Sequence, residues 1–403
     1  MWWNGDLKPP PPGQCENGAT EPQQPMSDNQ VFDIAVIGAG IAGASLASQL
    51  APDRSVVVLE RESQPGYHTT GRSAAMFMES YGPVAVRAMT RASRAFYLAP
   101  PAGFCERPLL SPRGSMVLAR PGQEAQLEHE FNNLVNSCAG LRRLRPDEAL
   151  ALVPCLRPER LAAAMLDDAA MDIDVHHLHQ AYLRRLRVHG GETRTRAEVT
   201  GARRVGSIWE LTLGDKTVLR AAVVVNAAGA WADAVGALFG AQHIGLVPHR
   251  RTAFTFKPPG GLATTHWPVV SGVDESYYFK PDAGVLLGSP ANADPMPPHD
   301  VMPEELDVAT AIHHIEAVTT MTIRRPERSW AGLRSFVPDG EMVIGWDTRC
   351  PAMFWLAAQG GYGIQSAPGA AMLAAALLRG QPLPAELLAE RIDVAALSPA
   401  RLR

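Results

Sequence analysis

The 403-residue chain has few of the features that serve nucleic-acid binding, disulfide bonding or membrane insertion. Its five cysteines are scattered, odd in number and free of any Cys-x-x-Cys pair, so neither a disulfide framework nor a zinc site is indicated. Only 19% of the residues are charged, the net charge is -4, and no basic block argues for nucleic acid. The longest apolar stretch, residues 367–378, is too short for a membrane span. The scattered cysteines favour the reducing cytoplasm, with peripheral contact to the inner membrane left open. We expect a monomer.

Apolar residues are plentiful. They make up 46% of the chain, enough to bury a large core and to build two domains. The first 30 residues differ from the rest because they are rich in Pro, Gln, Asn and Gly. They also lack the basic start and apolar centre of a signal peptide. We therefore predict a disordered leader over residues 1–30, with Met26 as an alternative start.

A buried strand, a tight glycine turn and a helix of small residues follow from Val31 onward. Gly38 permits the turn, Gly40 lets the backbone approach a pyrophosphate, and Gly43 lets helix and strand pack closely. Glu60 closes the next apolar strand, where a carboxylate can accept hydrogen bonds from both ribose hydroxyls. Strand, turn, helix, second strand and acid all fall in register, so the pattern predicts an adenine dinucleotide site.

Two further strand-to-loop units lie at residues 221–233 and 354–364, and a separate strand is predicted over 109–118. Residues 244–335 differ from these units, because predicted strands there alternate with turns that contain Pro and Gly. The fold class is therefore α/β: a Rossmann-like nucleotide domain with an inserted substrate domain on a mixed, largely antiparallel sheet. The predicted nucleotide domain comprises residues 31–108, 166–240 and 336–403, and the substrate domain comprises residues 109–165 and 241–335.

Four motifs together resemble one family. VIGAGIAGAS, GRSAA, NAAGAW and QGGYGIQ are similar to motifs of the FAD-dependent D-amino-acid oxidase and glycine oxidase superfamily, and within it to the bacterial D-arginine dehydrogenases. Longer strings such as PPAGFCE, KPDAGVLLGSPANADP and WAGLRSF extend the resemblance from residue 32 to the C-terminus. The resemblance implies FAD as cofactor. The absence of cysteine from residues 331–336 favours noncovalent attachment.

The resemblance also assigns residues to the cofactor. It places the glycine turn at the pyrophosphate, Glu60 and Arg61 at the adenosine ribose, and Val199 at the adenine. The second glycine loop would lie beside the flavin ring, where oriented amides stabilise an anionic reduced flavin. The implied cofactor residues are Gly38, Gly40, Ala42, Gly43, Glu60, Arg61, Thr69, Thr70, Gly71, Arg72, Ser73, Ala74, Ala75, Val199, Gly360, Gly361, Tyr362, Gly363 and Ile364.

Oxidation of an amino acid requires a held carboxylate, and guanidinium groups suit this because they form paired, charged hydrogen bonds. By resemblance, Arg251 and Arg334 form that clamp with the hydroxyl of Tyr278. Tyr81 would lie on a loop over the substrate, and the Gly361 carbonyl would accept from the substrate amine. Arg250 is a rival for the first arginine, because consecutive strand residues face opposite ways.

The implied reaction removes a hydride equivalent from Cα of a D-amino acid with a neutral amine. The resulting imino acid then hydrolyses to a 2-oxo acid and ammonia. The electron acceptor is unknown; a quinone, a dye-like carrier and oxygen are all open. The alternatives are a glycine- or sarcosine-type oxidase that produces hydrogen peroxide, a catalytically silent flavoprotein, and a nicotinamide-dependent dehydrogenase.

Two positions depart from the D-arginine dehydrogenase pattern. Met76 stands where those enzymes have a histidine, and Ser115 where they have the glutamate that binds the substrate guanidinium. Burying a guanidinium without a countercharge is costly, so these residues predict a less polar pocket and neutral or apolar D-amino acids. Glu79 and Glu106 are possible replacements for the missing acid.

No metal site is predicted. His176, His177 and His179 lie close together on a predicted helix, but their spacing does not converge on a metal as an i, i+4 pair would.

Overall fold

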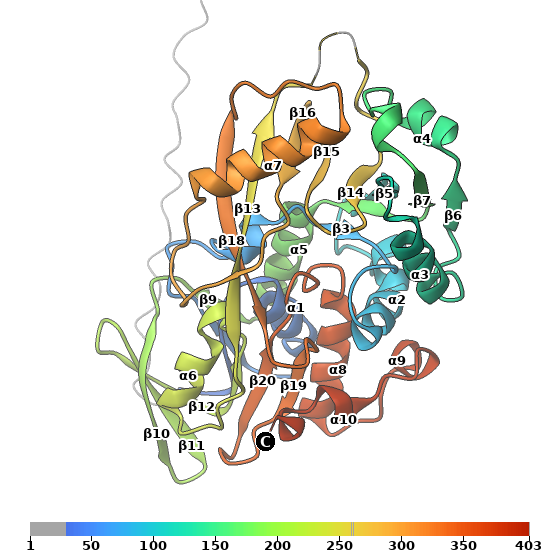
Figure 1. The fold of residues 1–403 in the computed structure, drawn as a ribbon. Coiled ribbons are helices and arrows are strands. Elements are labelled where there is room, and N and C mark those ends of the chain that lie inside the picture. Colours follow the sequence, from blue (N-terminus) through green and yellow to red (C-terminus); the bar gives the residue numbers. More distant parts are fainter. Residues whose placement is uncertain (1–29, 259, 261, 403) are drawn as a thin grey trace, which may run out of the picture. The chain divides into compact units, whose positions relative to one another are not determined.

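The structure is a computed structural model that describes residues 30–258, 260 and 262–402. From Val31 onward the chain forms one compact unit. The predicted leader and Met26 lie outside the described residues, apart from Gln30. Figure 1 shows the arrangement of the elements.

The first large sheet has eight strands and carries the nucleotide-binding pattern. Its order is β10-β11-β12-β1-β2-β9, with β20 beside β12 and β19 beside β20. β1 runs parallel to both β2 and β12. The strands are β1 (Val31–Ile37), β2 (Val56–Leu59), β9 (Glu192–Arg194), β10 (Val199–Val205), β11 (Ile208–Leu213), β12 (Val218–Asn226), β19 (Val343–Trp346) and β20 (Met353–Ala357).

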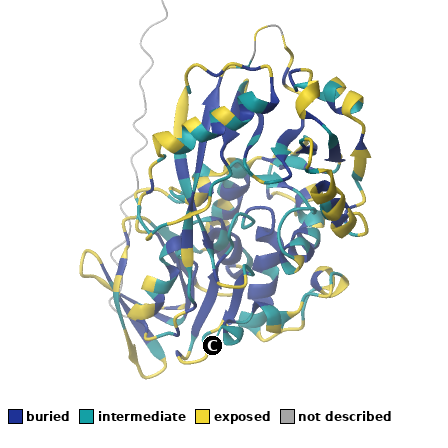
Figure 2. Cartoon of the chain, viewed as in Figure 1, coloured by how far each residue is buried: buried dark blue, intermediate teal, exposed yellow. Residues whose placement is uncertain are grey.

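Both faces of this sheet are covered, which is why its central strands are nearly continuous apolar runs. On one face Ile34 and Val36 join the core formed with α1 (Ile41–Leu50), α2 (Val84–Leu98) and α8 (Ala367–Arg379). On the other face Ala35 and Ile37 pack with residues of β10, β11 and α6 (Ala232–Leu238). α5 (Val175–Val188) packs beside α1. Figure 2 shows the buried strands between the helices.

The second large sheet has nine strands, in the order β17-β13-β16-β15-β14-β5-β7-β6, with β18 beside β13. α7 (Glu305–Val318) and α4 (Pro146–Leu152) contribute to its core, and α3 (Glu124–Leu134) packs on β5 and β7. In Figure 1, α7 lies across the strands of this sheet. The strands are β5 (Ser115–Ala119), β6 (Leu141–Leu144), β7 (Ala163–Asp167), β13 (Val247–Phe256), β14 (Val269–Gly272), β15 (Tyr278–Asp282), β16 (Val285–Ser289), β17 (Asp294–Pro295) and β18 (Arg328–Phe336).

A small sheet joins β3 (Met76–Phe77), β8 (Met171–Ile173) and β4 (Leu110–Pro112). The predicted strand over residues 109–118 is therefore two strands in different sheets. The chain turns between them at Gly114, whose φ of +77° favours glycine. The short helices α9 (Ala385–Ala389) and α10 (Val394–Leu397) complete the chain.

The predicted fold class is confirmed: the protein is α/β, with a Rossmann-like sheet and a second, mixed sheet. Strands of the first sheet fall within the predicted nucleotide-binding segments, and those of the second fall within the predicted substrate-binding segments except for the ends of β7 and β18. The residue boundaries of the two domains stay a prediction. Among the described residues, no helix is both long and apolar enough to span a membrane.

Candidate active site

The predicted glycine turn links β1 to α1 with little free space. Gly38 has a φ of +105°, and a Cβ atom there would lie 2.4 Å from the Ala227 carbonyl oxygen. A Cβ on Gly43 would lie 1.9 Å from the Gly38 carbonyl oxygen. Only glycine fits at both positions. The backbone at the start of α1 is thereby left open to the adjoining cavity, as an anion-binding helix N-terminus requires.

Glu60 ties the end of β2 to this turn. Its side chain is buried; Oε2 accepts from the Ala39 amide at 3.0 Å, and Oε1 accepts from the Glu62 amide at 3.0 Å. A carboxylate has about four lone-pair positions, so two remain for hydroxyl donors. The neighbouring Arg61 guanidinium lies over the Trp231 ring, 4.8 Å from its centroid.

The loop after β2 is anchored to helix α1 and to strand β18. Thr70 Oγ1 accepts from the Ile41 amide at 3.0 Å, at the first residue of α1. Thr69 Oγ1 donates to the Leu333 carbonyl at 2.7 Å, and Arg72 donates to the Ala331 carbonyl at 3.1 Å. The loop that contains GRSAA is thus held between the helix N-terminus and β18.

A cavity of about 530 Å³ runs along these elements. Fifteen predicted cofactor residues line it: Gly38, Gly40, Ala42, Glu60, Arg61, Thr69, Thr70, Arg72, Ser73, Ala74, Val199, Gly360, Gly361, Gly363 and Ile364. The other four do not. Gly43 packs against Gly38, the Gly71 amide donates to the Gly66 carbonyl at 2.8 Å, Ala75 lines a second cavity, and the Tyr362 ring contacts Tyr81.

Sequence reasoning missed part of this cavity's wall. Trp231 lines the cavity together with Tyr67, His68 and Gly229, and none of these four is among the implied cofactor residues. The signal was present, because Trp231 ends the NAAGAW motif that follows a parallel strand. Ligand contacts in open α/β sheets concentrate at such carboxyl ends.

The second cavity, of about 600 Å³, meets the first. The residues that line both are Ser73, Ala74, Arg251, Tyr278, Arg334, Gly361 and Ile364. The predicted carboxylate clamp and the second glycine loop therefore lie at the junction of the two cavities. Tyr81, Met76 and Ser115 line only the second cavity.

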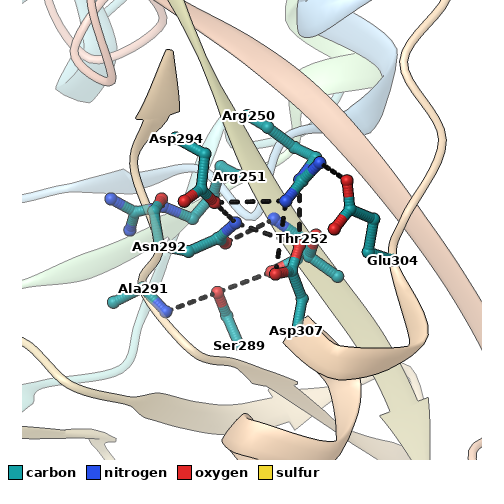
Figure 3. Close-up of polar contacts among 9 residues, drawn as sticks. All are labelled: Arg250, Arg251, Thr252, Ser289, Ala291, Asn292, Asp294, Glu304 and Asp307. Atoms are coloured by element: carbon teal, nitrogen blue, oxygen red, sulfur yellow. Dashed lines mark hydrogen bonds and ion pairs between the residues drawn. The ribbon is translucent and has the colours of Figure 1, made fainter. Parts of the chain in front are cut away.

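Arg251 and Arg250 project to opposite sides of β13 (Figure 3). Arg250 is buried and donates to Asp307 at 2.9 Å and to Asp294 at 3.3 Å, with Glu304 as a third partner. Arg251 lines both cavities, and its Nε donates to the Asn292 carbonyl at 2.6 Å. The structure thus brings Arg251 to the junction and keeps Arg250 away from it.

Arg334 faces the same junction from β18. Its Nη1 donates to the Tyr81 hydroxyl at 3.1 Å, and a Cβ on Gly361 would lie 3.0 Å from its Cζ. Within the described part of the chain, neither Arg251 nor Arg334 forms an ion pair with a carboxylate. Burial, together with the charge of Arg334, lowers the pKa of Arg251 to about 10. Two unpaired guanidinium groups that repel each other form a site for an anion.

The floor of the second cavity comes from alternate residues of adjacent strands, as the two-residue period of a strand requires. Register pairs Val269 with Ser115 and Ser115 with Asp167, and Tyr278 with Ser271. All five line the cavity.

The cavity holds an acid, Asp167, that was not among the suggested replacements. Ser115 replaces one carboxylate, but its cross-strand partner Asp167 places another beside it. Neither suggested replacement lines the cavity: Glu79 forms an ion pair with Arg94 at 2.6 Å, and Glu106 is exposed. Cross-strand pairing links residues 52 positions apart, which a reading along the chain could not find.

The histidines of α5 do not form a cluster that could hold a metal. His179 is buried and its Nε2 lies 2.8 Å from the Ala39 carbonyl. In residues 30–258, 260 and 262–402, no group of three His, Cys, Asp or Glu side chains could hold a metal ion.

A family model described as DAO, FAD dependent oxidoreductase, matches residues 33–377. The chain belongs to this family. FAD is its cofactor. The match includes both glycine loops and both arginines of the junction, so this FAD-dependent oxidoreductase carries the family's pattern across both sheets.

Curated relatives are longer. Mitochondrial dimethylglycine dehydrogenase of Rattus norvegicus is 25% identical over 395 residues, covering 91% of this chain and 45% of its own length. The same enzyme of Mus musculus is 24% identical over 408 residues, covering 94% of this chain and 46% of its own length. The chain thus spans less than half the length of these curated relatives.

Solved structures share the fold. Glycine oxidase from Geobacillus kaustophilus has a TM-score of 0.78 and 23% identity, covering 93% of this chain and 99% of its own. L-proline dehydrogenase from P. horikoshii has a TM-score of 0.78 and 22% identity, covering 92% and 98%.

The residues present fit FAD. The glycine cradle at Gly38 and Gly43 would be filled by any Cβ, and Glu60 is a buried acceptor beside it. The second loop offers glycines at the junction, where Gly360 has a φ of +51°. A dinucleotide therefore has a phosphate cradle at one end and the arginine pair at the other.

Proposed function

We propose that this oxidoreductase oxidises D-amino acids at Cα to imino acids, which water converts to 2-oxo acids and ammonia. The observation that carries the proposal is the pair Arg251 and Arg334, unpaired with any carboxylate in the described chain and placed where the two cavities meet. A substrate carboxylate is the anion that such a pair binds best, because both groups can donate two parallel hydrogen bonds.

Each residue at the junction has a distinct task in this proposal. Arg251 and Arg334 hold the carboxylate, and Tyr278 donates to it. The Tyr81 hydroxyl accepts from Arg334 and retains its own proton, so it can donate to the same carboxylate. The Gly361 carbonyl accepts from the substrate amine. FAD, when bound, accepts the hydride equivalent from Cα.

Orientation is the main contribution of the protein in this scheme. The clamp fixes the carboxylate and the Gly361 carbonyl fixes the amine. The Cα hydrogen can therefore point in only one direction. Tyr81 and Tyr362 pack edge to face, with ring centroids 5.0 Å apart, and this packing supports the Tyr81 ring whose hydroxyl accepts from Arg334. The D configuration is proposed on the sequence resemblance.

The test is anaerobic bleaching of the bound flavin by matched D- and L-amino acids. The expected result is reduction by D-amino acids and none by their L-enantiomers. Flavin that no amino acid bleaches would indicate a catalytically silent flavoprotein. Peroxide formed in air would identify oxygen as the acceptor, and reduction of a quinone or dye without peroxide would identify a dehydrogenase.

A further inference from the structure

We infer that Asp167 determines the side-chain specificity of this site by binding a positively charged end of the substrate, an amine or a guanidinium. The inference rests on the proposed function, because it needs a substrate held at Arg251 and Arg334. Asp167 lies at the end of β7, lines the second cavity and is 4% exposed.

The hydrogen bonds of Asp167 leave its charge uncompensated. Its Oδ2 accepts from the Ser80 hydroxyl at 2.8 Å, and its Oδ1 accepts from the Ala169 amide at 3.0 Å. These bonds use about half of its lone-pair positions and leave room for further donors. No arginine, lysine or histidine of the described chain forms an ion pair with it.

Two carboxylates that are less deeply buried than Asp167 are paired with cations. Asp172 forms ion pairs with Arg113 at 2.6 Å and with Lys280 at 2.5 Å. Asp307 forms one with Arg250 at 2.9 Å. A buried carboxylate is costly unless it is paired, and the fold supplies a cation to these two but not to Asp167. A substrate bound in the cavity has space to supply the cation that Asp167 lacks.

The floor of the cavity connects the clamp to Asp167. Tyr278 of the clamp pairs with Ser271 of β14. Val269, two residues before Ser271 on the same face, begins the row that continues through Ser115 to Asp167. Ser115 is small and leaves space above the floor. Lys280 also lines the cavity, but its Nζ donates to Asp172 and forms no ion pair with Asp167. A substrate held by its carboxylate can extend its side chain along this row.

Two further acids line the same cavity. Glu130 of α3 and Glu275 of the β14–β15 turn line the cavity, and neither forms an ion pair in the described chain. Glu275 acts on Arg251, where its charge opposes the lowering of the guanidinium pKa, whereas Glu130 adds a negative charge to the cavity wall. The cavity therefore favours a substrate with a carboxylate at one end and a cation at the other.

The experiment compares D-lysine with D-norleucine, which lacks the terminal amine, using the FAD-loaded full chain. For the wild-type protein we expect kcat/KM to be roughly ten- to a hundredfold higher for D-lysine, the range for hydrogen bonds to charged groups. Asp167→Asn should remove most of this preference by lowering the value for D-lysine, with D-norleucine changed by less than about twofold. Asp168→Asn is the matched control, because Asp168 is exposed and pairs with Arg142.

Several outcomes separate the two proposals. If D-norleucine is oxidised and wild-type protein shows no preference for D-lysine, the specificity role of Asp167 is overturned while the proposed function stands. Equal losses for both substrates in Asp167→Asn would also overturn it. If Asp167→Asn does not fold, the preference of the wild-type protein for D-lysine over D-norleucine alone decides whether the specificity role stands. If neither D-amino acid reduces the flavin, the proposed function itself has failed and the inference with it.

Discussion

Arg250 and Arg251 are consecutive residues of β13, and the acid cluster around the first positions the backbone that holds the second. Asp307 accepts from Arg250 at 2.9 Å and from the Asn292 side-chain amide at 3.0 Å. The Asn292 side-chain oxygen accepts from the Thr252 amide at 2.9 Å, and its backbone carbonyl accepts from Arg251 at 2.6 Å. The cluster in Figure 3 thereby orients the guanidinium at the junction.

Asn292→Ala should loosen Arg251 without removing it. The side-chain bonds to Thr252 and Asp307 are lost, so the carbonyl that holds Arg251 is no longer fixed. We expect KM to rise roughly three- to tenfold, in line with about 0.5–1.5 kcal/mol for a hydrogen bond, and kcat to change less. Steady-state kinetics and the Kd of benzoate measure the effect. As a control, Asn132→Ala, on the exposed face of α3, should change neither KM nor the Kd of benzoate. An unchanged KM in Asn292→Ala would show that the cluster is only structural.

Arg334→Met should lower kcat/KM for every amino-acid substrate to a similar extent. Its guanidinium faces the junction and donates to Tyr81, so its loss removes a charged hydrogen-bond donor to the carboxylate. We expect kcat/KM to fall by at least about tenfold, from roughly 1.5–3 kcal/mol for a charged hydrogen bond. Arg142→Met tests loss of an exposed arginine. Flavin content must stay unchanged, and normal kinetics in Arg334→Met would remove it from the clamp.

Gly43→Ala should abolish FAD binding. The added Cβ would overlap the Gly38 carbonyl, so helix α1 must move away from the turn that forms the phosphate cradle. Flavin absorbance per protein after purification measures the loss. Gly201→Ala is the control, because its Cβ would lie 3.6 Å from Thr212 in ordinary contact. Yellow Gly43→Ala protein with normal flavin content would contradict the close packing.

The sequence could predict what depends on neighbours along the chain. The glycine turn and Glu60 were recognisable because strand, turn and helix follow one another. The choice between Arg250 and Arg251 could not be predicted, because the two-residue period of a strand indicates only that consecutive side chains point to opposite faces. Asp167 was missed because it meets Ser115 through the pairing of β5 with β7, and long-range register is set by tertiary packing.

His179 should make the protein less stable in mild acid. Its imidazole is 4% exposed beside the glycine turn, and burial, together with the charge of His176, holds its pKa below the usual 6.5. Because the unfolded chain then binds a proton more readily, stability contributed by the neutral ring is full above pH 6.5 and is lost as pH falls below it. The Tm of the wild-type protein should therefore fall more steeply from pH 8 to about pH 5.5 than that of His179→Gln. His266→Gln, at an exposed position, should retain the wild-type slope. Equal slopes for wild type and His179→Gln would show that protonation of His179 does not contribute, because other titrating groups are common to both proteins.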